Sequence, residues 1–334
     1  MGCHFEPSRR FLLTGLGAVI AAPAVRAQTR ELAIPISSTS FATAQVRAAE
    51  VLGCYARHGL SVKFPMMDTG SNLTAALLSG SAPVILGGSG EQVAAWARGQ
   101  EVLTLVNVYW GLAATIVLAK EVADRTGVSP AAPVADRLKA LDGLTIASPS
   151  ATSNYTNSFK GAAEEVGSKI RYTYMSQPAM VAALESGVIQ GYTAGAPLWG
   201  SQVARGRAVI WLSGPRGDLK KQHSPASTTA FQAMRNVAER DRDLIHRVVD
   251  SYRSFSDTLS NTPEKVRDAL GKLYPQVEPE TMDVLFKAEG AAWKMRDVTP
   301  DDMRQEIAFM VSSGASLPGG SNIDPAAMIY AASN

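Results

Sequence analysis

Strand-like and helix-like segments alternate along the first two thirds of this 334-residue chain, and their order limits the folds that it can adopt. Short apolar runs such as "LAIPIS" (32–37) precede stretches such as "FATAQVRAAEVLGCYARHG" (41–59). Apolar residues at helical spacing and a closing glycine are typical of helices, and short runs rich in β-branched residues are typical of strands. The alternation predicts an α/β protein with a mainly parallel sheet.

The same strand and helix module occurs in both halves of the chain. "AALLSGSAPVILGG" (75–88) is matched by "VAALESGVIQGYTAG" (181–195): in each, a helical stretch ends in Ser-Gly and a strand runs out into small residues. From about residue 240 the chain is helical, and Thr262-Pro263 and Thr299-Pro300 each place an N-cap residue before a proline at the first helical position. The two matching halves predict two βα lobes.

The N-terminal segment predicts export. Arg9-Arg10 precede an apolar run over residues 11–22, and small residues lead to a cleavage site after Ala27. The apolar run is too short to span a bilayer, and the paired arginines resemble a twin-arginine export signal. We therefore expect residues 1–27 to be removed and the mature protein to lie in the periplasm.

Charge and cysteine content exclude several kinds of partner and site. The chain has 32 basic and 30 acidic residues, and three arginines and one glutamate precede the cleavage site, so the mature chain would carry 29 of each. This balance favours neither a nucleic-acid nor an anionic-membrane partner. Because Cys3 leaves with the signal, Cys54 has no disulfide partner.

Catalytic and metal-binding patterns are absent from the sequence. His58, His223 and His246 have no metal-ligand spacing, and neither G-x-S-x-G nor H-E-x-x-H occurs. We expect no catalytic residue, no metal and no cofactor, and therefore no enzyme.

Small polar residues gather just beyond the predicted strand ends. In open α/β sheets ligands bind there, and the free N–H groups and dipole of each following helix favour an anionic or polar group. The turn Gly87-Gly88-Ser89-Gly90 is followed by no Gly-Lys-Ser/Thr and is not G-x-G-x-x-G, so it predicts a ligand-cradling turn or a plain tight turn rather than a nucleotide site. The candidate ligand-binding residues in these turns are Ser38, Thr39, Ser40, Ser71, Gly88, Ser89, Ser150, Thr152, Ser153, Asn154, Thr193 and Gly195.

Four aromatic residues adjoin the same turns. Phe41 starts the first helix, Tyr109 and Trp110 end a strand, and Trp199 follows "TAGAP". Such side chains either enclose an organic ligand or pack in the core, and the sequence leaves both interpretations open.

Four segments resemble a known family. "AAEVLGCYARHGLSVKF" (48–64), "GSNLTAALLSGSAPVILGG" (70–88), "LDGLTIASPSATSNY" (141–155) and "MVAALESGVIQGYTAGAP" (180–197) are similar in order and pattern to periplasmic substrate-binding proteins of ABC transporters, of the sulfonate, nitrate and taurine type. The resemblance implies a bilobal periplasmic-binding-protein type II fold, with a ligand held between lobes that close by hinge motion.

The resemblance also implies lobe bounds and partners. Lobe one would hold residues 30–118 and 226–334, lobe two would hold residues 119–225, and two crossing strands near 115–120 and 227–231 would join them. The ligand would be a small organic anion, either a sulfonate or an aliphatic or aromatic carboxylate. The protein would be a monomer that docks on an ABC permease in the inner membrane.

This chain departs from the family pattern at three positions. Ala82, Gln190 and Ala196 stand where relatives usually carry acidic residues, which would suit an anionic ligand, and Arg216 is either a candidate cation for it or a solvated loop residue. Two other functions share the fold: an enzyme resembling thiamine-pyrimidine synthases, whose Cys-rich motif this chain lacks, and a ligand-sensing partner of a membrane receptor.

Overall fold

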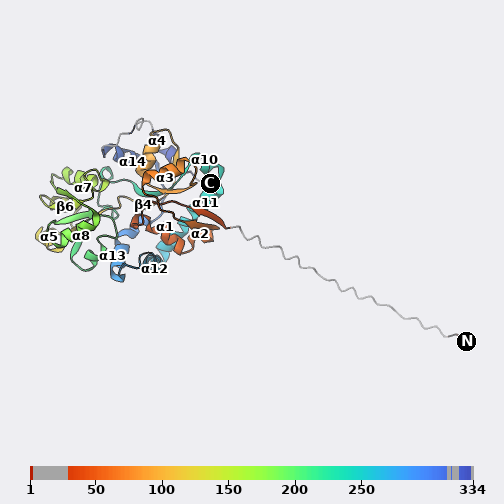
Figure 1. Cartoon of the computed structure of the whole chain (residues 1–334), viewed down its shortest axis with the longest axis horizontal. Coiled ribbons are helices and arrows are strands. Elements are labelled where there is room, and N and C mark those ends of the chain that lie inside the picture. Colours follow the sequence, from red (N-terminus) through yellow and green to blue (C-terminus); the bar gives the residue numbers. More distant parts are fainter. Residues whose placement is uncertain (3–28, 314–316, 318–322, 332–334) are drawn as a thin grey trace.

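The structure is a computed structural model that describes residues 1–2, 29–313, 317 and 323–331. The predicted export signal and its cleavage site lie almost wholly outside these residues. Figure 1 shows elements from the middle of the chain, including β6 and helices α5, α7 and α8, gathered on one side of the molecule. Elements from the two ends of the chain share the other side, where α14 packs on α4.

Ten strands form three sheets within the described residues. The strands are β1 (Arg30–Ala33), β2 (Leu60–Lys63), β3 (Ile85–Gly87), β4 (Val102–Trp110), β5 (Thr115–Ala119), β6 (Thr145–Ser148), β7 (Arg171–Tyr174), β8 (Gly191–Ala194), β9 (Ala208–Ser213) and β10 (Ser227–Met234). Their order is β1-β2, β3-β10-β4 and β7-β6-β8-β5-β9.

Helices fill the connections and most of the C-terminal third. The α-helices are α1 (Phe41–Val51), α2 (Cys54–Arg57), α3 (Gly70–Leu78), α4 (Ser89–Trp96), α5 (Lys120–Arg125), α6 (Val134–Lys139), α7 (Asn154–Glu165), α8 (Gln177–Glu185), α9 (Gly200–Ala204), α10 (Arg235–Arg240), α11 (Arg242–Asn261), α12 (Pro263–Leu273), α13 (Pro279–Glu289) and α14 (Pro300–Ser312). None of the described helices is both long and apolar enough to cross a membrane.

The α/β class is confirmed, but the expectation of mainly parallel sheets is wrong. Strand β1 is parallel to β2, and β6 is parallel to β7 and β8. Strand β10 is antiparallel to β3 and β4, and β5 is antiparallel to β8 and β9. Strands β5 and β10 are the first strands that the chain forms after it passes from one sheet to the other. A parallel pairing needs a crossover helix, and neither passage contains one, so both strands pair antiparallel.

The chain passes between the three-stranded and five-stranded sheets twice. Residues 111–114, the first crossing segment, lead from β4 to β5, and residues 224–226, the second crossing segment, lead into β10. Strand β5 pairs wholly within the five-stranded sheet. The chain therefore leaves the three-stranded sheet at residues 111–114, before residue 118, which the sequence predicted as the end of this part of lobe one.

The five-stranded sheet has an apolar core of its own on one face. Phe159 and Trp211 are fully buried there with Ile116 and Ile146. Beside this core, Arg137 on α6 is 8% exposed and pairs with Asp218 through two hydrogen bonds of 2.9 and 3.0 Å. The same guanidinium donates to the carbonyl of Trp211 at 2.6 Å, so one buried cation joins α6, β9 and the loop that follows β9.

Candidate functional site

Two of the predicted hydroxyl turns cap the helices that they open. The Ser40 hydroxyl accepts a hydrogen bond from the Ala42 N–H at 3.3 Å, and the Ser153 hydroxyl accepts one from the Tyr155 N–H at 3.1 Å. In α1 the other N–H groups of the first turn are also engaged, because Phe41 donates to the Ala196 carbonyl and Thr43 to the Ser40 carbonyl, so only the helix dipole remains there to favour an anion. The predicted helix start at Phe41 is confirmed, and α7 starts at Asn154, just after its Ser153 cap.

Three of the predicted segments meet at one place. The Phe41 N–H donates to the carbonyl of Ala196 at 3.2 Å, which joins the start of α1 to the turn after β8. A Cβ atom on Gly195 would lie 3.1 Å from the Ala113 carbonyl oxygen and 3.2 Å from the Tyr155 hydroxyl. The start of α1, the first crossing segment, the start of α7 and the turn after β8 therefore form one junction, which we call the central junction.

The remaining hydroxyl candidates of the first turn and of α7 lie beside this junction on the surface side. Ser38 donates to the Ser40 hydroxyl at 2.7 Å, and the Thr39 carbonyl accepts from the Tyr274 hydroxyl at 2.6 Å. The side chains that remain exposed near the start of α7 are those of Ser150, Thr152 and Asn154.

The glycine-rich turn lies at the other edge of the three-stranded sheet. The Ser89 hydroxyl donates to the Ser227 carbonyl, and Gln232 donates to the Gly88 carbonyl at 3.1 Å, so both residues adjoin β10. Ser71 is exposed on α3. The Ser89 hydroxyl thus bonds the turn to β10. No hydrogen bond joins this turn or Ser71 to Gly195 in the described part of the chain.

The aromatic candidates are mostly buried. Phe41, Tyr109 and Trp199 are at most 1% exposed, and the Phe41 ring lies 5.1 Å from Tyr274 and 5.8 Å from Trp293 between centroids. Trp110 keeps exposed surface. In this conformation core packing accounts for the first three rings, and Trp110 alone of the four is partly exposed, with the Arg296 guanidinium over one face of its ring.

The central junction contains a buried carboxyl group that the sequence did not single out. Glu289, at the end of α13, is 2% exposed and accepts a hydrogen bond from the Tyr109 hydroxyl. Burial raises the pKa of Glu289 to about 7, although the Tyr109 hydrogen bond and the charge of Arg216 act to lower it. Burial, with the charge of Glu289, raises the pKa of Tyr155 to about 12. A lone glutamate in an amphipathic helix carries no sequence signal for such a position.

Several buried polar atoms around the junction have no partner within the described residues. They include the hydroxyl of Thr193 and the indole nitrogens of Trp199 and Trp293. A buried polar atom without a hydrogen bond costs about 1–3 kcal/mol, and all three residues are fully buried in this conformation. No cluster of three or more His, Cys, Asp or Glu that could hold a metal occurs in the described part of the chain.

Comparisons with known proteins concern the family and the fold of the chain. A family model described as the NMT1-like family matches residues 28–273. No curated protein sequence matches the chain.

Solved structures with the same fold include three binding proteins. The periplasmic aliphatic sulphonate binding protein SsuA from Escherichia coli is 18% identical with a TM-score of 0.62, and the match covers 90% of this chain and 97% of that one. The alkanesulfonate-binding protein SsuA from Xanthomonas axonopodis pv. citri, bound to MOPS, is 16% identical with a TM-score of 0.60, and the match covers 91% and 99%. The periplasmic nitrate-binding protein NrtA from Synechocystis PCC 6803 is 11% identical with a TM-score of 0.52, and the match covers 88% of each chain. The bilobal periplasmic-binding-protein fold is thereby confirmed.

Proposed function

Because the chain belongs to the NMT1-like family, we propose that it is the periplasmic solute-binding component of an ABC importer. It captures a small organic anion, a sulfonate or an aliphatic or aromatic carboxylate, and delivers it as a monomer to a permease in the inner membrane. The proposal includes export with cleavage after Ala27. It also includes two lobes with the bounds expected from the sequence, 30–118 with 226–334 and 119–225, except that residues 115–118 join the second lobe because β5 pairs only within the five-stranded sheet. The neighbours named above are binding proteins, and we assign this chain a binding role rather than catalysis.

The observation that carries the proposal is the central junction. It joins the start of α1, residues 112–114, the start of α7 and the turn at Gly195, which are far apart in sequence and belong to both halves of the molecule. The dipoles of α1 and α7, whose N-termini meet here, and the charge of Arg216, which acts on the buried Glu289, favour one anionic group between the lobes.

Of the three uncharged residues that stand where relatives usually carry acidic ones, only one lies where its lack of charge would favour an anionic ligand. Ala196 lies at the junction, where its carbonyl contacts Phe41. Gln190 instead accepts the Thr145 N–H at 2.9 Å, at the opposite ends of β6 and β8, and Ala82 packs in a small cluster with Leu73. The absence of acidic residues at positions 82 and 190 therefore has no bearing on a ligand at the junction.

Thermal unfolding of residues 28–334 with a panel of small anions tests the function. We expect one class among ethanesulfonate, taurine, nitrate and benzoate to raise the unfolding temperature, because a ligand at one hundred times its dissociation constant adds about 2.7 kcal/mol of stability. Gly195→Val should abolish that shift, since its side chain would enter the space held by the Ala113 carbonyl and Tyr155.

The matched control for this variant is Gly271→Val, because no atom lies within 4 Å of a Cβ at Gly271. It should keep the ligand-dependent shift. An equal shift in Gly195→Val and the parent protein would place the ligand elsewhere and contradict the proposed site.

Binding of the anion is expected to weaken as the pH rises through about 7. Glu289 is neutral below its pKa of about 7 and becomes a negative charge in the junction above it, so the anion meets repulsion only at higher pH. Titration calorimetry at pH 6 and pH 8 with the anion that shifts the panel most measures this. Glu289→Gln should remove most of the difference, while Glu278→Gln, at an exposed position, should not.

A further inference from the structure

The two crossing segments are tied to each other by hydrogen bonds. The Gly111 N–H donates to the Ala226 carbonyl at 2.9 Å, and the Ser227 hydroxyl donates to the Tyr109 carbonyl at 2.9 Å. The Thr228 hydroxyl accepts the Ala113 N–H at 3.0 Å and donates to the Gly111 carbonyl at 2.7 Å. Any motion of one sheet relative to the other must therefore move both segments together.

Helix α14 holds the second crossing segment through a buried carboxyl group. Glu306 is 2% exposed. Its carboxyl group accepts a hydrogen bond from the Ala226 N–H at 2.9 Å and also interacts with the Ser227 N–H. Next to it, Gln305 donates to the Ser224 carbonyl at 3.0 Å. The segment is thus fixed to α14 on both sides of Pro225.

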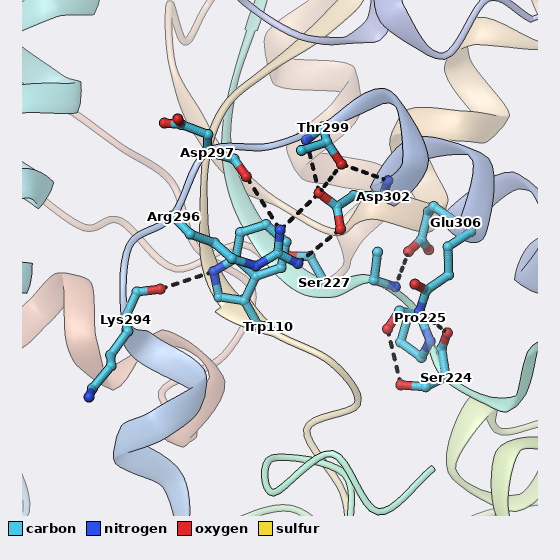
Figure 2. A network of polar contacts seen from close by, with 12 residues as sticks. Trp110, Ser224, Pro225, Ser227, Lys294, Arg296, Asp297, Thr299, Asp302 and Glu306 are labelled. Atoms are coloured by element: carbon cyan, nitrogen blue, oxygen red, sulfur yellow. Dashed lines mark hydrogen bonds and ion pairs between the residues drawn. The ribbon is translucent and has the colours of Figure 1, made fainter. Parts of the chain in front are cut away.

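The same helix holds the end of β4 through an arginine. Arg296 donates two hydrogen bonds to Asp302, of 3.0 and 2.9 Å, and its guanidinium lies 3.3 Å from the centre of the Trp110 ring. Asp302 in turn forms a capping box with Thr299 at the start of α14. Figure 2 shows Arg296 between Trp110 and Asp302, with Glu306 further along the helix beside the Pro225 segment.

Helix α14 itself is anchored to the part of the molecule that carries the three-stranded sheet. Met303 is fully buried with Val93 of α4 and Met328. A Cβ atom on Gly90 would lie 2.9 Å from the Met310 sulfur, so the two helices approach closely. Residues 296–306 lie beyond the residues that the family model matches, 28–273.

We propose that helix α14 is a hinge clamp, in which Glu306 and Arg296 are positioning residues that fix both crossing segments on the side of the three-stranded sheet. The inference rests on the proposed function, in which the lobes close on a ligand. Bending is then left to Ala114, at the end of the first crossing segment, and to residues 214–220, ahead of the 3-10 helix Lys221–His223 that packs on α14. Gly217 there has a φ of 75°, in the left-handed region that glycine adopts freely.

The test measures the distance between the lobes in the ligand-free protein. Spin labels at Glu239→Cys on α10 and Lys160→Cys on α7, both exposed, report it by pulsed electron paramagnetic resonance, with the buried Cys54 replaced by serine. Glu306→Ala and Arg296→Ala should each broaden or shift the distance distribution. Hydrogen exchange at Ala226 and Ser227 should rise about tenfold in Glu306→Ala, because the variant removes the side-chain acceptor that protects these N–H groups.

Two further variants separate positioning from general loss of stability. Glu306→Gln keeps an oxygen acceptor and should restore the narrow distribution, while Arg304→Ala, exposed on the same helix and paired with Asp301, should leave it unchanged. A lower unfolding temperature with an unchanged distance distribution in both Glu306→Ala and Arg296→Ala would overturn the clamp. Should Glu306→Ala fail to fold, Arg296→Ala alone decides the matter, since Arg296 is exposed. No ligand is added, so a negative result here is distinct from a failure of the anion panel.

Discussion

Replacing Arg137 with methionine is expected to lower the free energy of unfolding by about 3–5 kcal/mol, because it leaves the carboxylate of Asp218 buried without its partner. The guanidinium binds Asp218 twice, and it also donates to the carbonyls of Trp211 and Ala132, at 2.6 and 2.9 Å. Removing it breaks four hydrogen bonds between α6, its preceding loop and β9. Urea unfolding at pH 7, followed by circular dichroism, measures the change.

Two controls define the size of this effect. Lys120→Met breaks an exposed pair with Asp124 and should cost less than about 1 kcal/mol. The double variant Arg137→Met with Asp218→Leu should recover part of the loss, since no charge then remains unpaired. A loss in Arg137→Met no larger than that in Lys120→Met would show that the buried pair does not stabilise this part of the fold.

Stability is expected to fall as the pH rises from about 5 to about 8, opposite to the usual behaviour of carboxyl groups. Burial raises the pKa of Glu289 to about 7 and that of Glu306 to about 8, from 4.5. In this window the folded protein retains protons that the unfolded chain releases, so ionisation favours unfolding. One pKa unit corresponds to about 1.4 kcal/mol, so the two groups together contribute on the order of several kcal/mol.

The pH profile of urea unfolding between pH 5 and pH 8 checks this. The double variant Glu289→Gln with Glu306→Gln should flatten the profile. Asp302 and Asp241 do not interfere, because the pKa of each is lowered, and the stability that they contribute is lost only below about pH 4. A wild-type profile that is flat or rises with pH would contradict the burial of two neutral carboxyl groups.

Local sequence patterns predicted the elements well but not their ends. The stretch 41–59, expected as one helix, is two helices, because Gly53 takes a φ of 68° between them. The strand expected over residues 32–37 ends at Ala33, ahead of Pro35, and Ile36 makes only an isolated bridge to Met66. Proline and glycine act on single residues, which a pattern averaged over ten residues does not locate.

The proline-led helix starts were predictable because their signal is local. Helices α12 and α14 begin at Pro263 and Pro300 as expected, and Thr299 forms its cap with Asp302. The strand directions were not predictable from the same kind of signal. Strand direction depends on which sheet each strand joins. Strand β5 joins a different sheet from β4, which precedes it, and β10 joins a different sheet from β9.

Sequence analysis predicted only those residues of the candidate site that lie next to the end of a strand. Sequence analysis named Phe41, Tyr109, Asn154 and Gly195, which lie at or next to the central junction. It missed Glu289 and Glu306, which lie on C-terminal helices. Those helices pack against the three-stranded sheet, and no local pattern in the sequence predicts that packing. Their ligand-binding and positioning roles stay predictions.

The arrangement of the three-stranded sheet has a consequence for how the chain acquires its structure. Strand β10 lies between β3 and β4, so Phe231 pairs with Val106 and Leu86 across more than a hundred residues of intervening chain. The strands of the five-stranded sheet all come from residues 115–213, although Asp218 and α13 complete the packing around them. During synthesis the middle of the chain can therefore form its sheet while the N-terminal strands wait for β10. Because contacts so far apart in sequence form slowly, we expect that last pairing to limit the rate of folding.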